Sequence, residues 1–457
     1  MPPPIDRVDP AKAWLPWEPD AGQPWNLKWA AHLYRRAGFG ASLAELRGAV
    51  QHGYHATLVR VFEGPAQPAS LDFIKLGERM AGRNEPQELR AWWLYCILNG
   101  PVPLLEKLTL FWHNHFATSI AKVQRTDLMF NQNKLIRQHA LGKFRPFLGD
   151  MSRDPAMLVW LDSNSNVKGK PNENYARELM ELFSLGVGHY TEKDIREAAR
   201  AFTGWHTDDD KFDFNAVLHD DGPKTVLSRL GNWNGDDVVR IVLDQPAAAH
   251  FLVRKLYRYL ISESVPPPPV LLEPLADSFR KSDYDVGLLV KTMLSSRHFF
   301  SSHAYRHRIK CPVEYVVDVV RNLVPNSELQ VALAPLAAHL EEMGQQLFAP
   351  PNVKGWEGGR NWLNTATVLA RHNFAQMTLT GNLGFDPLQA FRAEKLSEPG
   401  RIVQFLAEQF LDGEIGAEQR KKLQAYLGDG KLQGTAREQR VKETMHAFMT
   451  MPEYQLA

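Results

Sequence analysis

Helical periodicity is the feature of this sequence that most constrains its fold. Apolar residues recur over much of the chain at the three-to-four-residue spacing of one helix face. This spacing predicts helices over residues 33–50, 88–98, 103–116, 248–260, 286–294 and 312–323, and two or three more within 402–451. The predicted fold class is therefore all-α (mainly helical).

Strand-like alternation is limited to residues 224–230 and, more weakly, to 212–218, so we expect at most a short β-hairpin near 212–230. Turn-forming residues cluster at 161–172, 204–237 and 266–269. The 457 residues fit one large multi-helix domain with long functional loops. We expect an N-terminal extension at 1–24, a helical core at 25–395, and C-terminal helices packed on that core at 396–457.

Composition and missing motifs narrow the classes of function. The chain carries 53 Lys plus Arg and 52 Asp plus Glu, which does not indicate a nucleic-acid partner. Two cysteines, Cys96 and Cys311, are too few for a disulfide framework. No secretory signal is visible and no apolar stretch approaches the ~20 residues of a membrane span, so we expect a soluble, cytoplasmic protein. The motifs GxxxxGKS/T, GxGxxG, GxSxG, HExxH and CxxC are absent, which gives no support to standard nucleotide-binding, α/β-hydrolase or zincin sites.

Residues 162–173 match the spacing of a twelve-residue calcium loop. Asp162, Asn164, Asn166 and Glu173 occupy its positions 1, 3, 5 and 12, where side-chain oxygens converge on the ion. Val167 stands at the sixth position, where such a loop favours glycine. The first cofactor candidate is therefore a divalent metal, calcium. The alternative is a polar loop whose side chains cap the following helix.

Two segments carry further acid/base or metal-binding candidates. The helix expected after this loop bears Arg177 and Glu178, which indicate either a functional carboxylate or a buried Arg–Glu network. The segment FWHNHF (111–116) separates His113 from His115 by two positions, so that on a helix their side chains diverge by roughly 200°. One histidine near Glu178 is therefore more plausible than a two-histidine metal site, and a packed core histidine is the alternative.

His219, Asp220 and Lys224 lie in the turn-rich segment HDDGPK (219–224). Loops with mixed charges often position a general acid/base or bind an anion. Arg200 and Trp205, at the end of the helix expected before this segment, are candidate ligand-binding residues. A solvated acidic loop is the alternative.

The segment PPNVKGWEGGRNWLN (350–364) combines Lys354, Trp356 and Trp362 with three glycines in a non-helical stretch. Such a loop can form the wall of a pocket or stack a sugar or base on its Trp residues. Structural burial of both Trp side chains is the alternative.

Six segments, taken in order, resemble a bacterial family known as the domain of unknown function number 1800. They are AHLYRRAGFG (31–40), FWHNHFATS (111–119), PNENYARELMELFSLGVGHYTEKDIREAARAFTGW (171–205), HDDGPK (219–224), FLVRKLYRYL (251–260) and PPNVKGWEGGRNWLNTATVLARHNF (350–374). The resemblance implies a large helical domain and marks 111–119, 162–178, 200–224 and 351–364 as signature regions. It also implies that many relatives are exported, and that their genes often neighbour those of a sulfatase-like family, number 1501 of the same series.

Two functions follow from these candidates. The first is an enzyme, a hydrolase or transferase, that uses acid/base and metal-ion chemistry on an anionic or glycan-type substrate. Its catalytic residues would be His113, His115, Arg177, Glu178, His219, Asp220 and Lys224. The second is a non-catalytic partner that binds or matures the sulfatase-like protein or a glycan through the Trp-rich loops. An enzyme should gather its charged groups in one pocket, whereas a binding protein should expose an aromatic patch.

Overall fold

Helices form most of the chain in the computed structural model, which describes residues 5–64, 72–208, 210–324, 332–428 and 434–457. These residues contain 24 α-helices and two two-stranded sheets, so the prediction of a mainly helical fold is confirmed. Residues 1–4 of the predicted N-terminal extension and 429–433 of the predicted C-terminal helices lie outside the described residues. Within the described ranges, every helix is too short or too polar to traverse a lipid bilayer.

The N-terminal helices contain a break that the sequence pattern does not show. After a 3-10 turn at Ile5–Arg7 come α1 (Pro10–Ala13), α2 (Leu27–Ala37), α3 (Leu43–His52) and α4 (Tyr54–Glu63). The helix predicted over 33–50 is therefore two helices. Gly40 lies between them at φ +83°, and a Cβ there would come within 2.0 Å of Asp318 Oδ1, so this close approach requires glycine.

One helix of the next group joins the two hydrophobic cores of the protein. The group consists of α5 (Phe73–Ala81), α6 (Pro86–Asn99), α7 (Pro103–His115), α8 (Ile120–Val123) and α9 (Thr126–His139). Helix α7 begins at a proline, whose missing N–H is tolerated in the first turn. Its residues Leu104 and Leu108 belong to one core and Leu110 to the other, so α7 is buried on opposite faces.

The following group contains an irregular helix. It consists of α10 (Phe144–Ser152), α11 (Pro155–Trp160), a 3-10 turn (Ser163–Ser165), α12 (Asn174–Glu178), α13 (Glu192–Ala201) and α14 (Gly235–Leu243). Helix α12 continues directly into a π-helical turn at Leu179–Ser184, where the Ser184 hydroxyl bonds the Leu179 carbonyl. π-helical turns are often found at functional sites.

Two hairpins occur where the sequence predicted at most one. β1 (Trp205–Asp208) pairs antiparallel with β2 (Lys211–Phe214), and β3 (Lys224–Val226) pairs with β4 (Arg229–Gly231). Only Trp205 of β1 is buried, so this strand lacks the alternation from which strands are predicted. The second hairpin turns at Leu227 and Ser228, both at positive φ, and Asp194 Oδ1 accepts the Leu227 N–H at 2.8 Å.

Only some of the remaining helices were predicted from the sequence. They are α15 (Pro246–Leu260), α16 (Pro269–Lys281), α17 (Val286–Leu294), α18 (Pro312–Leu323), α19 (Leu333–Glu342), a 3-10 turn (Gly359–Trp362), α20 (Thr365–Thr378), α21 (Gln389–Ala393), α22 (Pro399–Leu411), α23 (Ala417–Leu427), α24 (Gly434–Thr450) and a 3-10 turn (Pro452–Gln455). The helices predicted at 286–294 and 312–323 coincide with α17 and α18.

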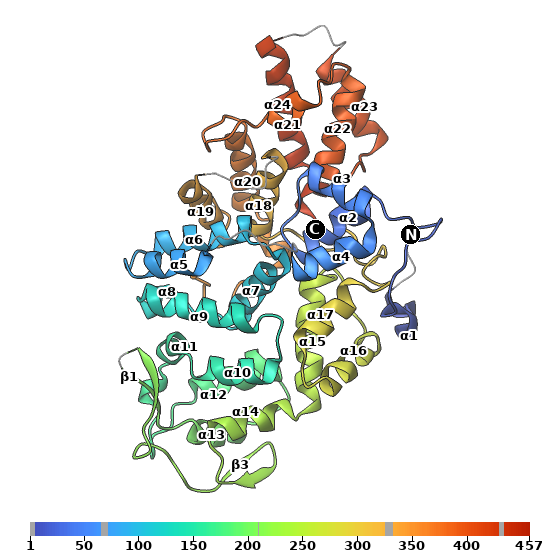
Figure 1. The fold of residues 1–457 in the computed structure, drawn as a ribbon. Coiled ribbons are helices and arrows are strands. Elements are labelled where there is room, and N and C mark those ends of the chain that lie inside the picture. Colours follow the sequence, from blue (N-terminus) through green and yellow to red (C-terminus); the bar gives the residue numbers. More distant parts are fainter. Residues whose placement is uncertain (1–4, 65–71, 209, 325–331, 429–433) are drawn as a thin grey trace.

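The molecule is elongated, with the hairpins at one end and α21 to α24 at the other (Figure 1). Helices α2, α4, α7 and α15 lie between these ends, where the two cores meet (Figure 1). The C-terminus returns to this middle region, because the Ala457 carbonyl accepts a hydrogen bond from the Arg36 guanidinium at 3.2 Å.

Candidate functional site

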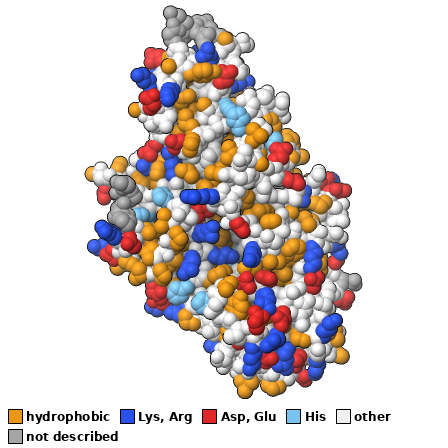
Figure 2. All heavy atoms as spheres, turned by 180° about the vertical axis from the view of Figure 1, so that it is seen from behind, with side chains coloured by type: hydrophobic (Ala, Val, Ile, Leu, Met, Phe, Trp, Pro, Cys, Tyr) orange, Lys and Arg blue, Asp and Glu red, His pale blue; other side chains and the backbone are white. Residues whose placement is uncertain are grey.

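A pocket of about 430 Å³ lies between α7, α15 and the loop at 350–364. Its volume falls within the ~300–1,000 Å³ of small-molecule sites. The side chains that line it include Phe111, Asn114 and His115 of α7, Lys255, Arg258 and Tyr259 of α15, Glu263, Arg308, Cys311 and Gln345, and Lys354, Trp356, Glu357, Asn361 and Trp362 of the loop. Figure 2 shows the back of the molecule, where Lys and Arg side chains gather around a hollow near the middle. Segments more than two hundred residues apart in the chain thus meet at one basic pocket.

Asn114 fixes the loop to the end of α7. Its Oδ1 accepts the Trp356 backbone N–H at 2.6 Å, and its Nδ2 donates to the Trp356 carbonyl at 3.1 Å. Gly355 is needed beside this pair, because it has φ +78° and a Cβ would lie 2.2 Å from Asn114 Oδ1. The Trp356 ring centre lies 5.9 Å from that of His113. The FWHNHF segment and the loop therefore form one continuous wall.

Positive charge in the pocket is only partly neutralised. Four cations (Lys255, Arg258, Arg308 and Lys354) and two carboxylates (Glu263 and Glu357) line it. Within the described residues, only Arg308 among these cations forms an ion pair, with Glu314 at 2.9 Å. The Glu263 carboxylate accepts the Ile309 backbone N–H at 2.6 Å. Unpaired cations around a concave surface favour the binding of an anion.

Lys255 and His115 are two pocket residues whose pKa values are strongly lowered. Burial, together with the positive charge of Arg258, lowers the pKa of Lys255 to about 7. Burial and the charge of Lys255 lower the pKa of His115 well below its usual value, although a bond with the Phe183 carbonyl opposes this shift. His115 Nε2 faces that carbonyl at 3.1 Å and so carries the proton, while Nδ1 is buried without a partner among the described residues. Strongly perturbed groups in a pocket are typical of functional sites.

A buried ion cluster behind the pocket holds Arg308 in place. Glu314 bonds both Arg308, at 2.9 Å, and the Lys107 ammonium. Burial by itself would raise the pKa of Glu314. The positive charges of Arg308 and Lys107 outweigh burial and hold this pKa well below its usual range. The Arg308 guanidinium lies 4.7 Å from the Tyr259 ring centre. Lys107 also donates to the Gly38 carbonyl at 2.7 Å, so the segment 31–40 supports the pocket from behind.

The two histidines of α7 face different surroundings, as their spacing on a helix predicts. His115 lines the pocket. His113 is 1% exposed and is packed against the rings of Trp93, Phe348 and Trp356. Burial lowers the pKa of His113 to about 3, so its ring is neutral at physiological pH.

Arg177 and Glu178, although adjacent in sequence, also face different surroundings. Arg177 forms ion pairs with Glu173 at 3.0 Å and with Glu192 at 2.7 Å, which stabilise the start of α12. Glu178 is half-buried, and its side chain has no hydrogen bond among the described residues. Burial and the neighbouring Glu181 raise the pKa of Glu178, while Arg177 and the pocket residue Lys354 oppose the rise. Of these two, Glu178 therefore remains a candidate near the pocket.

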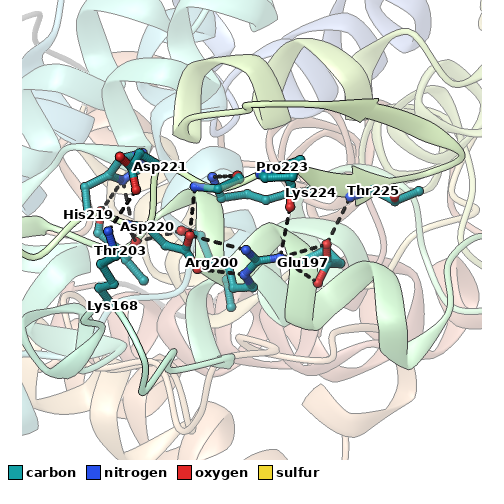
Figure 3. A network of polar contacts seen from close by, with 12 residues as sticks. Lys168, Glu197, Arg200, Thr203, His219, Asp220, Asp221, Pro223, Lys224 and Thr225 are labelled. Atoms are coloured by element: carbon teal, nitrogen blue, oxygen red, sulfur yellow. Dashed lines mark hydrogen bonds and ion pairs between the residues drawn. The ribbon is translucent and has the colours of Figure 1, made fainter.

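The segment HDDGPK forms a separate polar network beside α13 rather than part of this pocket (Figure 3). Arg200 binds Asp220 through Nε at 2.7 Å and also binds Glu197 at 3.1 Å. The hydrogen bond from Arg200 lowers the pKa of Asp220. His219 Nδ1 lies 2.8 Å from the Thr203 carbonyl.

Lys224 closes the same network. It is buried and donates to the Gly222 carbonyl at 3.0 Å. Burial lowers its pKa, against the opposing charge of Asp220. Trp205 is 4% exposed, and its ring centre lies 4.8 Å from the guanidinium carbon of Arg153. Together with bonds from the Thr225 and Leu227 N–H groups to Glu197 and Asp194, these contacts hold the loop and the β3–β4 hairpin on α13.

The loop predicted to bind calcium is held by protein partners. Asp162 pairs with Lys122 at 2.8 Å, and Asn164 bonds Thr207 at 2.9 Å. Asn166 donates to the Ala199 carbonyl at 3.0 Å, and Glu173 pairs with Arg177. Calcium in this loop would have to displace both cations. In the described part of the chain, no three His, Cys, Asp or Glu side chains are grouped to hold a metal.

Four of the candidates predicted from the sequence line the same pocket: His115, Lys354, Trp356 and Trp362. The pocket also contains residues that the sequence did not single out. Lys255 and Arg258 are the main additions, and Asn114 is another. All three lie in segments that carry the family resemblance. A signal was present in FLVRKLYRYL, where two cations stand one turn apart on a largely buried helix.

The fold and the site define a mainly helical protein with a basic, aromatic-walled pocket at the junction of its two cores. The family described as "Protein of unknown function (DUF1800)" matches residues 32–456, and the chain therefore belongs to this family. No curated protein and no solved structure was found to match the chain.

Proposed function

We propose that this protein is an enzyme that binds an anionic substrate in the pocket between α7, α15 and the loop at 350–364, and that it acts there by acid/base chemistry. The observation that carries the proposal is the convergence of Lys255, Arg258 and Lys354, none of which has an ion pair among the described residues. Burying or crowding cations without partners is unfavourable, so such groups indicate a ligand that supplies the missing charge.

The residues divide into two roles. Arg258 and Lys354 bind the anionic group of the substrate, since both are exposed at the pocket and can donate charge-assisted hydrogen bonds to it. Lys255 accepts or donates the proton, because a pKa of about 7 lets its amine change charge near neutral pH. Phe111, Tyr259, Trp356 and Trp362 give the rest of the substrate an apolar wall suited to a sugar or another ring.

The alternative, a binding partner of a sulfatase-like protein or a glycan, has less support. It calls for exposed aromatic side chains, whereas Trp356 is 7% exposed and Trp362 is 8% exposed. Association with a sulfatase-like protein stays a prediction.

The test is to titrate the protein with inorganic phosphate and with sulfate and to measure the affinity of each anion by calorimetry. Arg258→Gln should weaken binding roughly ten- to hundredfold, the effect of losing one charge-assisted hydrogen bond. Arg254→Gln is the matched control, because Arg254 is exposed on the same helix but does not line the pocket. Equal losses in the two variants, or no saturable binding of either anion, would contradict the proposal.

The acid/base role needs a separate assay. A panel of phosphate, sulfate and carboxylate esters, acidic sugars included, is offered to the protein and to Lys255→Gln. Turnover that disappears in Lys255→Gln, while phosphate affinity changes little, supports catalysis by this amine. Binding without turnover of any compound would favour the non-catalytic alternative.

A further inference from the structure

We propose that Lys255 is an amine nucleophile that forms an imine with the carbonyl carbon of an anionic aldehyde or ketone held in the pocket. This inference rests on the proposed function, because Arg258 and Lys354 must first hold the anionic group. It names the substrate class: a small carbonyl compound that also carries a phosphate, sulfate or carboxylate.

The contacts of Lys255 differ from those of the buried Lys107 and Lys310. Its amine has one polar contact among the described residues, the Leu182 carbonyl at 3.4 Å, which lies in the π-helical turn after α12. The Phe251 ring centre lies 5.2 Å from it on another side. By contrast, Lys107 contacts the Glu314 carboxylate, and Lys310 contacts Asp318 at 2.5 Å. Those two amines each contact a carboxylate, whereas Lys255 contacts none among the described residues.

The surroundings of Lys255 favour its neutral form. Burial disfavours the charged amine, and Arg258, one turn further along α15, adds a positive charge. His115 of α7 and Lys354 of the loop line the same pocket and supply no negative charge. The carboxylates of the pocket, Glu263 and Glu357, form no ion pair with it within the described residues. A desolvated lysine next to a second cation is the usual arrangement of an imine-forming amine.

The resulting population of neutral amine is large. With a pKa of about 7, about half of Lys255 is unprotonated at pH 7. For an ordinary lysine with a pKa of ~10.4, the unprotonated fraction at pH 7 is roughly a thousandfold smaller. Cys311, the other potential nucleophile in the pocket, is not an alternative, because burial and Glu314 raise the pKa of its thiol to about 12.

The reaction is balanced without a further reactant. The lone pair of Lys255 Nζ attacks the carbonyl carbon, and the electrons of the carbon–oxygen π bond move to oxygen. A C–N bond forms and gives a carbinolamine. The amine then loses its two protons to the oxygen, which leaves as water, and a C=N bond remains. The amine–carbonyl pair is neither oxidised nor reduced.

Pyridoxal 5′-phosphate is a suitable probe, because it combines an aldehyde with a phosphate. The full chain is incubated with the probe at pH 7, and sodium cyanoborohydride supplies hydride to reduce the imine to a stable secondary amine. We expect one adduct per chain, located by peptide mass spectrometry on Lys255. Lys255→Arg should lose this adduct. Lys193→Arg should retain the adduct, since Lys193 is exposed and does not line the pocket.

Two further measurements keep the inference apart from the proposed function. Inorganic phosphate should slow labelling competitively, and Arg258→Gln, which keeps the amine, should raise the half-saturating probe concentration roughly tenfold. If phosphate and the probe compete for one site but no adduct forms at Lys255, the imine inference is overturned and anion binding stands. Labelling spread over surface lysines without preference for Lys255 also overturns it. If neither phosphate nor the probe saturates, the proposed function itself fails.

Discussion

The side-chain amide of Asn114 bonds both backbone groups of Trp356, a residue 242 positions away, at 2.6 and 3.1 Å. An asparagine amide has one acceptor and one donor group and here satisfies a peptide N–H and a peptide carbonyl at once. Through this pair, the end of α7 holds the loop that closes the pocket opposite α15. The shape of the pocket therefore depends on a contact that neither segment makes by itself.

Removing this amide should loosen the loop. Asn114→Ala leaves the Trp356 N–H and carbonyl without their partner, at a cost of about 1–3 kcal/mol in the free energy of unfolding. We expect urea unfolding to show this loss, and phosphate affinity to fall with it. Asn373→Ala is the matched control, because Asn373 is exposed and makes no hydrogen bond among the described residues. Unchanged stability and affinity in Asn114→Ala would show that the loop is held by other contacts.

Gly355→Ala should disturb the same contact from the other side. Its added Cβ would lie 2.2 Å from Asn114 Oδ1. Gly344→Ala separates this clash from backbone strain, since Gly344 also has positive φ but has open space around a Cβ. We expect the midpoint of thermal unfolding to fall further for Gly355→Ala than for Gly344→Ala. Equal shifts would mean that only the backbone conformation matters.

Lys255 should make stability depend on pH in a defined direction. Its folded-state pKa of about 7 is below the ~10.4 of an unfolded lysine. Between these values the unfolded chain binds more protons, so the destabilisation is fully present below pH 7 and disappears as pH rises through the unfolded value. Lys255→Met should therefore raise the free energy of unfolding at pH 7 and lose this advantage near pH 10. Urea unfolding at both pH values tests this, with the exposed Lys193→Met expected to show no such trend.

The HDDGPK network should contribute to stability without affecting the pocket. Asp220→Asn removes the charge that Arg200 binds and should cost about 1–3 kcal/mol at pH 7. The pKa of Asp220 is lowered in the fold, so its contribution is present above the unfolded value near 3.8 and is lost as pH falls through the folded value. Phosphate affinity should stay the same. Asp221→Asn, whose side chain is 81% exposed, should have little effect on either quantity. A loss of anion binding or turnover in Asp220→Asn would instead return this loop to the active site.

The calcium proposal for residues 162–173 has its own test. Elemental analysis of the purified protein is combined with thermal melts with and without a chelator. A site at 100-fold saturation adds about 2.7 kcal/mol, which a chelator would remove. Stoichiometric calcium and a melt that loses its calcium dependence in Asp162→Asn would support the loop. Bound zinc, iron or manganese would instead indicate a different metal site, and an unchanged melt without metal would contradict the calcium site.

Local sequence was enough to predict several of the longer helices. The segments 286–294 and 312–323 form α17 and α18 at the predicted bounds, because apolar spacing is a short-range signal. Helix α18 also begins at a proline, which is another local signal. The break at Gly40 was missed, since it depends on the approach of Asp318 from a distant helix. The strand at Trp205–Asp208 was missed because its partner strand, rather than its own pattern, defines it.

For the site, the sequence by itself determined which side chains are present and that segments such as 111–119 and 351–364 are unusual. The tertiary structure alone decided which of them meet. It placed His115 in the pocket and His113 in the core, and it separated HDDGPK from both. It also decided the chemistry of Lys255, because the largest cause of its lowered pKa is burial, and burial depends on how distant segments of the chain pack around α15.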